Sequence, residues 1–136
     1  MPITHEWLIP DQVMGLRWTG IITEEDLQAL DAVILQILNA AHGSHIHFIS
    51  NELDLLKELS VKSYIQTRSP RHTRFGWYIV VQPRHNAFAR MVTQMACSLL
   101  QIRFRIVENE ESAWDTLQRI NPQILRPGSP SSNRAS

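Results

Sequence analysis

The sequence predicts a single α/β domain: a mostly parallel, five-stranded sheet with packed helices, in the order β-β-α-β-α-β-α-β-α. Three observations support this fold class. The chain of 136 residues has the length of one domain. Two alternating segments open it, separated by three residues, which is typical of an antiparallel hairpin. Strand-length apolar segments then alternate with helical periodicity, which implies right-handed crossovers between parallel strands.

Each element follows from its local pattern. Strict alternation, as in "VMGLRWTG" and "IRFRIV", has the period of a half-buried strand, whereas the uninterrupted "WYIVV" is typical of a central strand. Helices are indicated by apolar residues three and four apart behind a capping residue, as where Thr23 precedes an acidic first turn. These patterns predict strands over residues 4–9, 13–20, 45–50, 77–82 and 102–107, and helices over 23–43, 51–66, 86–101 and 109–121.

The helix predicted over 86–101 has an apolar stripe that we expect to face the core. Its spacing is that of one helical face, and Cys97 lies on or beside it. A buried structural cysteine is therefore expected there rather than a nucleophile, because no histidine partner is implied. The stripe consists of Phe88, Met91, Val92, Met95 and Leu99.

The ends of the domain are set by composition. Residues 1–121 carry all the predicted elements, so we assign them to the domain. Residues 122–136 are rich in Pro, Ser and Gly and are expected to form a disordered tail.

No apolar stretch is long enough to span a membrane, and the N-terminus has no basic region followed by an apolar block. A cytoplasmic location is the resulting expectation.

A net charge of zero conceals an uneven distribution. Residues 1–58 hold nine acidic residues against two basic ones, whereas residues 59–107 hold eight basic residues and no acidic one. Two interpretations stay open: charge pairing within the chain or in a homodimer, and a basic face for an anionic partner. Nucleic acid is a weaker candidate, because the domain as a whole is not basic.

The sequence lacks the motifs of common enzymes. It has no Gly-rich dinucleotide fingerprint, no phosphate-binding loop and no nucleophile elbow. Its single cysteine excludes an internal disulfide and a Cys-only zinc site. His42, His45 and His47 lie close in sequence, but no nearby acid completes a metal site before Glu52, so surface histidines are expected. We therefore expect no cofactor, no metal and no catalytic residue.

The element order and four segments resemble the SpoIIAA-like group, which includes the STAS (anti-sigma-factor antagonist) and SEC14-related small domains. The segments are "LRWTGIITEEDLQAL", "IHFIS", "FGWYIVV" and "IRFRIVENEESAWDTL", and the resemblance covers residues 4–121. It implies a single SpoIIAA-like α/β domain that acts as a non-enzymatic regulatory or protein-interaction module. In the anti-sigma-factor antagonists, a serine that opens the helix after the third strand is phosphorylated by a partner kinase.

Ser50 and Asn51 stand where that serine would be. The segment "FISNELDLLKEL" places them between a predicted strand and a predicted helix. The resemblance implies a phospho-acceptor at Ser50, but the preceding acid, the second serine and the glycine of the family pattern are absent. Local chemistry favours a plain helix cap at Ser50 or Asn51.

A basic loop over residues 67–76 is the second candidate site. It lies where a strand enters the sheet, which is the less common edge for a ligand site in α/β proteins. A solvated loop and an anion- or partner-binding loop both fit this pattern. The candidate residues are Arg68, Arg71, His72 and Arg74.

We therefore expect a regulatory or protein-interaction module that acts through a protein partner and can form a homodimer. A small anionic or lipid-like ligand held at the helix N-termini is the alternative, and an uncharacterised enzyme is the remaining one.

Overall fold

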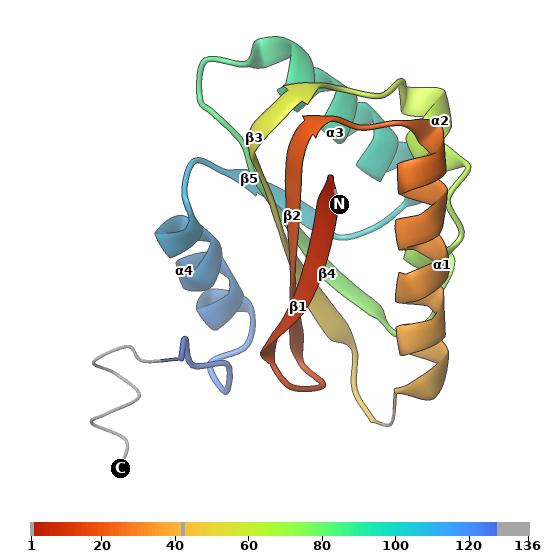
Figure 1. Ribbon diagram of the computed structural model, residues 1–136. Helices are drawn as coiled ribbons and strands as arrows, with labels where there is room; N and C mark the ends of the chain where they lie inside the picture. The colour runs from red at the N-terminus through yellow and green to blue at the C-terminus, as the bar shows by residue number, and fades with distance from the viewer. Residues whose placement is uncertain (1, 42, 128–136) are drawn as a thin grey trace.

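The computed structural model describes residues 2–41 and 43–127, and its elements follow the predicted order. The five strands lie in the sheet in chain order, with β1 antiparallel to β2 and every later neighbour parallel (Figure 1). The predicted mostly parallel sheet is thus confirmed. The strands are β1 (Ile3–Ile9), β2 (Val13–Ile21), β3 (Ile46–Lys57), β4 (Phe75–Val81) and β5 (Phe104–Val107).

The helices cover the two faces of the sheet unequally. Right-handed crossovers between sequential parallel strands place their connecting helices on one face. Accordingly α1, α2 and α3 share a face, and α4, which follows the last strand, covers the other (Figure 1). The helices are α1 (Glu24–Ala40), α2 (Val61–Ile65), α3 (Ala87–Leu100) and α4 (Glu110–Ile120), with a 3₁₀ turn, η1 (Ser69–Arg71).

Two apolar cores lie on the two faces of the sheet. Successive residues of a strand point to opposite faces, so Phe48 packs in the α1-side core and Ile49 in the α4-side core. Trp18 and Leu38 belong to the first core, and Trp114 belongs to the second. The sheet is therefore buried on both sides at its centre, as the apolar sequence of β4 predicts.

The largest departure from the prediction lies in β3, which runs on to Lys57 instead of ending at residue 50. The helix predicted over 51–66 is wrong over most of its length, because α2 is a five-residue helix capped by Ser60. The cause is tertiary: β2 is nine residues long, and its final part pairs with the second half of β3. The cross-strand ion pair of Arg17 with Asp54, at 3.0 Å, belongs to this extension.

The packed domain extends past the predicted boundary at residue 121. Ile124 is 1% exposed and belongs to the α4-side core. This part of the expected tail therefore packs on the domain. Residues 128–136 of the expected tail lie outside the described residues.

The two outermost strands, β1 and β5, have different side-chain chemistry. The Arg105 guanidinium on β5 lies 5.0 Å from the centroid of the Trp77 ring. The guanidinium of Arg103, which immediately precedes β5, lies 5.7 Å from the same centroid. On β1, the pairing with β2 shifts register between Trp7 and Ile9.

Candidate functional site

Ser50 lies inside β3, fully buried, and is not a helix cap. Its Oγ accepts hydrogen bonds from Trp18 Nε1 at 2.7 Å and from the Tyr78 hydroxyl at 3.0 Å. The cap prediction is wrong for Ser50 because the helix it would cap does not form. The hydroxyl is also enclosed by side chains from both neighbouring strands, so a kinase would reach it only after local unfolding.

Asn51 is likewise a strand residue that holds neighbouring segments together. Its Oδ1 accepts the backbone N–H of Leu53 at 3.0 Å, and its Nδ2 donates to Glu110 Oε1 at 3.1 Å. The second bond joins β3 to the first turn of α4. Asn51 therefore fixes the end of the sheet instead of starting a helix.

Glu52 is the centre of a buried polar network that the sequence did not reveal. Its carboxylate accepts hydrogen bonds from Ser50 Oγ at 3.4 Å and from Gln82 Nε2 at 3.3 Å. The same Gln82 nitrogen lies 2.6 Å from Thr93 Oγ1 on α3. The network therefore links β3, β4 and α3 beneath the helical layer.

Burial makes Glu52 an unusually weak acid. Desolvation first, and then the nearby Glu58 carboxylate, raise the pKa of Glu52 to about 8, against the opposing effect of its two hydrogen bonds. Desolvation also raises the pKa of Glu58, although its hydrogen bond from the Tyr64 hydroxyl acts the other way. Two carboxyl groups with raised pKa values therefore lie close enough to influence each other.

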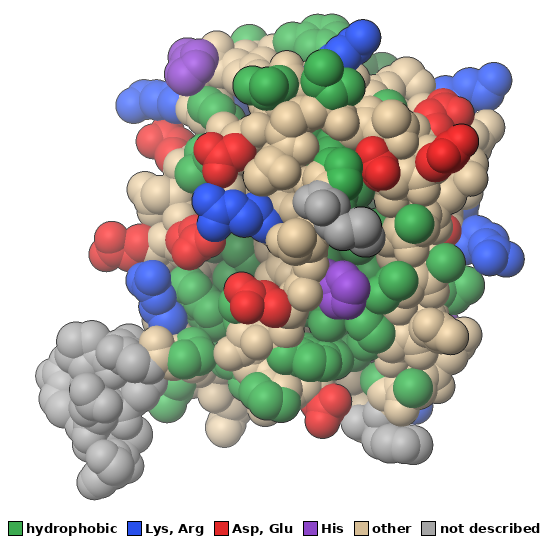
Figure 2. Space-filling view, in the orientation of Figure 1, with side chains coloured by type: hydrophobic (Ala, Val, Ile, Leu, Met, Phe, Trp, Pro, Cys, Tyr) green, Lys and Arg blue, Asp and Glu red, His purple; other side chains and the backbone are tan. Residues whose placement is uncertain are grey.

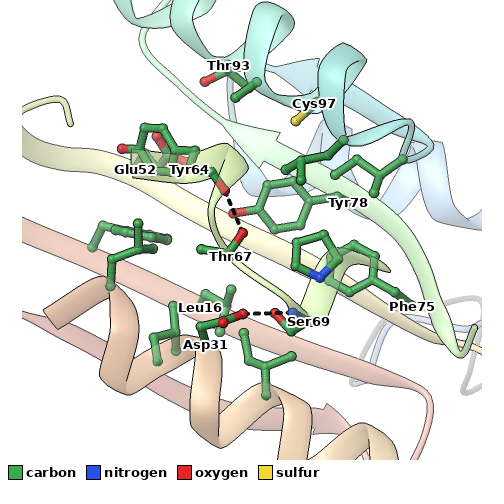
Figure 3. Close-up of a pocket in the computed structure, with 18 of the residues that line it drawn as sticks. Leu16, Asp31, Glu52, Tyr64, Thr67, Ser69, Phe75, Tyr78, Thr93 and Cys97 are labelled. Atoms are coloured by element: carbon green, nitrogen blue, oxygen red, sulfur yellow. Dashed lines mark hydrogen bonds between the residues drawn. The ribbon is translucent and has the colours of Figure 1, made fainter. Parts of the chain in front are cut away.

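These groups line a mostly apolar cavity of about 80 Å³ between the sheet and the layer of α1, α2 and α3. Figure 3 shows Glu52, Tyr64 and Tyr78 with Thr93 and Cys97 of α3 around this space. Its apolar wall includes Leu16 of β2, which the close-up also labels. The cavity thus joins residues far apart in sequence into one site.

Cys97 has its expected buried position in α3. Desolvation, with a contribution from Glu52, raises the pKa of the Cys97 thiol to about 12. A thiol in that state carries almost no thiolate at neutral pH, so it is a poor nucleophile.

The outer face of α3 contradicts the predicted packing of this helix. Phe88, Met91, Met95 and Leu99, which we name the α3 stripe, are 63%, 48%, 49% and 60% exposed. Only Val92 of the predicted apolar face is buried. The residues that turn inward are small: Ala89, Thr93, Ala96 and Cys97 accompany Val92. Small residues allow α3 to lie close to the sheet, and the large ones are left outside.

Two further large apolar side chains are exposed in the second half of β3. Leu56 is 80% exposed and Leu53 is 41% exposed. Figure 2 shows hydrophobic side chains at the upper edge of the molecule, over the end of β3 and the start of α3. It also shows acidic side chains beside the start of α1, whose first turn holds Glu24, Glu25 and Asp26.

The basic loop uses most of its predicted binding groups within the chain. The backbone N–H groups of Arg68 and Ser69 donate to the Asp31 carboxylate at 2.9 and 2.8 Å. The Arg71 guanidinium donates to the backbone carbonyl of Thr67 in the same loop and to that of Ile65 at the end of α2.

The remaining two candidates of this loop contact the end of α1. His72 Nε2 lies 2.9 Å from Asn39 Oδ1, and the Arg74 guanidinium donates to the carbonyl of Ala41. The side chains of Arg71, His72 and Arg74 therefore form hydrogen bonds that hold the loop in place on the domain.

Two of the three clustered histidines are described, and they do not converge on a metal site. His47 Nδ1 accepts the backbone N–H of Trp77 at 2.9 Å, and desolvation lowers the pKa of His47. Over residues 2–41 and 43–127, no three His, Cys, Asp or Glu side chains are placed to hold a metal ion. His42 lies outside these ranges.

The fold is SpoIIAA-like. The structure is similar to that of an uncharacterised DUF3478-family protein with a SpoIIAA-like fold from Shewanella loihica, with a TM-score of 0.61. The match covers 85% of this chain and 91% of the other, at 16% sequence identity, so it establishes the fold alone. No protein-family model matches the chain, and no curated protein matches it by sequence.

In the part of the chain that the structure describes, no helix combines the length and the apolar character needed to cross a bilayer.

Proposed function

We propose that this protein is a non-enzymatic interaction module that binds an acidic, amphipathic helix of a partner protein through the α3 stripe. The single observation that supports it is the exposure of four large apolar side chains on one helical face. Residues three and four apart lie side by side on a helix, so Phe88, Met91, Met95 and Leu99 form a continuous ridge. The solvent-facing side of a surface helix is normally polar, so this apolar face is unusual.

The chemistry of the ridge suits a helical partner. A helix presents apolar residues with the same spacing, and such faces commonly dock into apolar surfaces on interaction domains. Met91 and Met95 have flexible, polarizable side chains that adapt to partners of different shape.

The charges near α3 indicate that an acidic partner helix would bind. The sequence from residue 59 to 107 contains no acidic residue, and α3 itself carries only Arg90 as a charged residue. Arg84 precedes the helix with its side chain 82% exposed, and its contact with Glu108 is long at 3.5 Å. A partner helix with acidic flanks would be attracted to this surface. Two copies of α3 packed face to face would instead bring like charges together.

The test uses the methionine methyl groups as reporters. The protein is labelled with ¹³C-methyl methionine, so that Met91 and Met95 report on the ridge while Met14, which is 1% exposed, reports on the core. The probe is an 18-residue helical peptide of Leu and Glu in amphipathic order, and the control peptide has Lys in place of Glu. We expect the acidic peptide to shift the Met91 and Met95 signals and to leave the Met14 signal in place.

Matched variants separate apolar contact from charge. Met95→Asp should abolish the shift of the remaining Met91 signal, whereas Gln94→Asp, which adds the same charge beside the ridge, should preserve it. Three results would overturn the proposal. They are stronger binding of the Lys peptide, shifts produced only by lipid vesicles, and shifts that depend on protein concentration alone, which would indicate a homodimer.

A further inference from the structure

The interior cavity offers a second site, on the inner side of α3 and independent of the α3 stripe. Its wall is built from four parts of the fold: the sheet, α1, the α2–η1 segment and α3. Leucine, isoleucine and aromatic side chains make most of this wall, with Trp18 and Phe75 among them. A pocket of this kind, largely apolar with a few converging polar groups, is typical of sites for small molecules.

The carboxyl groups of the wall have no basic counterpart in it. Asp31 of α1, Glu52 of β3 and Glu58 just after β3 line the cavity, and among the described residues no lysine or arginine does so. Asp31 is occupied by two backbone N–H groups of the basic loop. Glu52 and Glu58 make hydrogen bonds with neutral partners, and neither is in a salt bridge with a described residue.

One further acceptor lies in the same network. Gln82 is 1% exposed, and its nitrogen holds both Glu52 and Thr93, which line the cavity. Its oxygen, Oε1, is buried and accepts no hydrogen bond from the described residues. A buried carbonyl oxygen without a donor costs free energy, so the network around Glu52 is short of hydrogen-bond donors.

We propose that the cavity binds a small apolar cation, a short branched alkylamine, with its ammonium group between Glu52 and Glu58. The ammonium supplies a positive charge and three hydrogen-bond donors, and the apolar wall surrounds the alkyl part. The size limit follows from the volume: 80 Å³ is about half of an apolar cavity of roughly 150 Å³ that holds benzene, so the ligand must be smaller than benzene.

This ligand class differs from the anionic ligand that the sequence suggested. An anion in the cavity would face three carboxyl groups and no described cation. An alkylammonium ion would instead favour the ionised form of Glu52, whose charge is otherwise disfavoured by burial and by Glu58. The inference goes beyond the proposed function, because it requires no partner protein.

Three probes with the same branched carbon skeleton test the inference: isobutylamine, isobutanol and isobutyrate. Each is titrated into the ¹⁵N-labelled protein at pH 7, and binding is followed by amide chemical shifts of β3 and α3. We expect isobutylamine to bind at least tenfold more tightly than isobutanol, and isobutyrate not to bind. Tighter binding of isobutyrate, or no amine-induced shift up to 50 mM, would overturn the proposal.

Variants locate the amine inside the cavity. Glu52→Gln should weaken isobutylamine at least tenfold and leave isobutanol within twofold, and Glu58→Gln should act in the same direction. Ala96→Leu, which fills the cavity from α3, should block both probes. Glu25→Gln, an exposed carboxylate on α1, is the matched control and should change nothing. Amine binding that survives both glutamine variants would show attachment to surface carboxylates and would refute the site.

Discussion

Replacing Glu52 by glutamine should remove a large part of the pH dependence of folding. The pKa of Glu52 is 4.5 in the unfolded chain and rises to about 8 on folding, mainly because burial disfavours the carboxylate. Between these two values the folded protein keeps a proton that the unfolded chain has lost. Folding stability therefore falls as pH rises through this window, by up to about 1.4 kcal/mol per pH unit.

The total effect is large compared with the stability of a domain. Over the interval from pH 4.5 to about 8 it amounts to roughly 5 kcal/mol, against roughly 5–15 kcal/mol for a typical domain. The glutamine variant has nearly the same shape and cannot ionise. Its free energy of unfolding should therefore match that of the parent near pH 4.5 and exceed it progressively up to pH 8.

Urea unfolding at pH 5, 6, 7, 8 and 9, followed by tryptophan fluorescence, measures both curves. The comparison between the two proteins cancels the contribution of groups that they share, the histidines included. Glu25→Gln, at an exposed position in the first turn of α1, serves as the control and should follow the parent. Parallel curves for the parent and Glu52→Gln would refute the reasoning, because a carboxyl group that ionises equally in both states has no effect on the slope.

Three further outcomes are expected. Ser50→Ala should cost about 2–4 kcal/mol in urea unfolding, since it leaves the Trp18 indole N–H and the Tyr78 hydroxyl buried without their acceptor; a loss below about 1 kcal/mol, the usual value of a cap, would contradict this. Gly76→Ala should lower stability by about 1–3 kcal/mol, because the added carbon would lie 2.4 Å from a histidine ring nitrogen of β3; an unchanged unfolding midpoint would count against that close approach. Cys97 should react with iodoacetamide at pH 8 roughly 1,000-fold more slowly than in the unfolded chain, given its pKa of about 12; similar rates would show that the thiol is not buried as described.

The sequence was sufficient for the sheet and for the order of elements, because periodicity is a local property. It was insufficient for residues 51–57. "NELDLLK" has good helix formers after a capping residue, yet β2 continues beside it and pairs with it, from Thr19 opposite Asp54 to Ile21 opposite Lys57. Such pairing between distant segments overrides local preference. An N-cap signal alone cannot reveal whether a neighbouring strand is long enough to compete.

The buried site was missed for the same reason. In a helix, Glu52 would occupy an exposed first turn, whereas in a strand it faces the cavity beside Ser50. The orientation of α3 was missed for another reason. Apolar patterning ranks residues by hydrophobicity, but close packing on the sheet selected Ala89 and Ala96 and turned the larger Met91 and Met95 outward.

The guanidinium groups beside Trp77 have a consequence for how the chain behaves at high concentration. The outer side of β5 has no strand next to it within the described residues, and an open strand edge is a template for aggregation. A second copy that paired antiparallel with β5 would bring its own Arg105 and Arg103 against these arginines. The register shift in β1 twists the opposite edge away from flat pairing. Both ends of the sheet thus resist strand-to-strand growth into larger sheets.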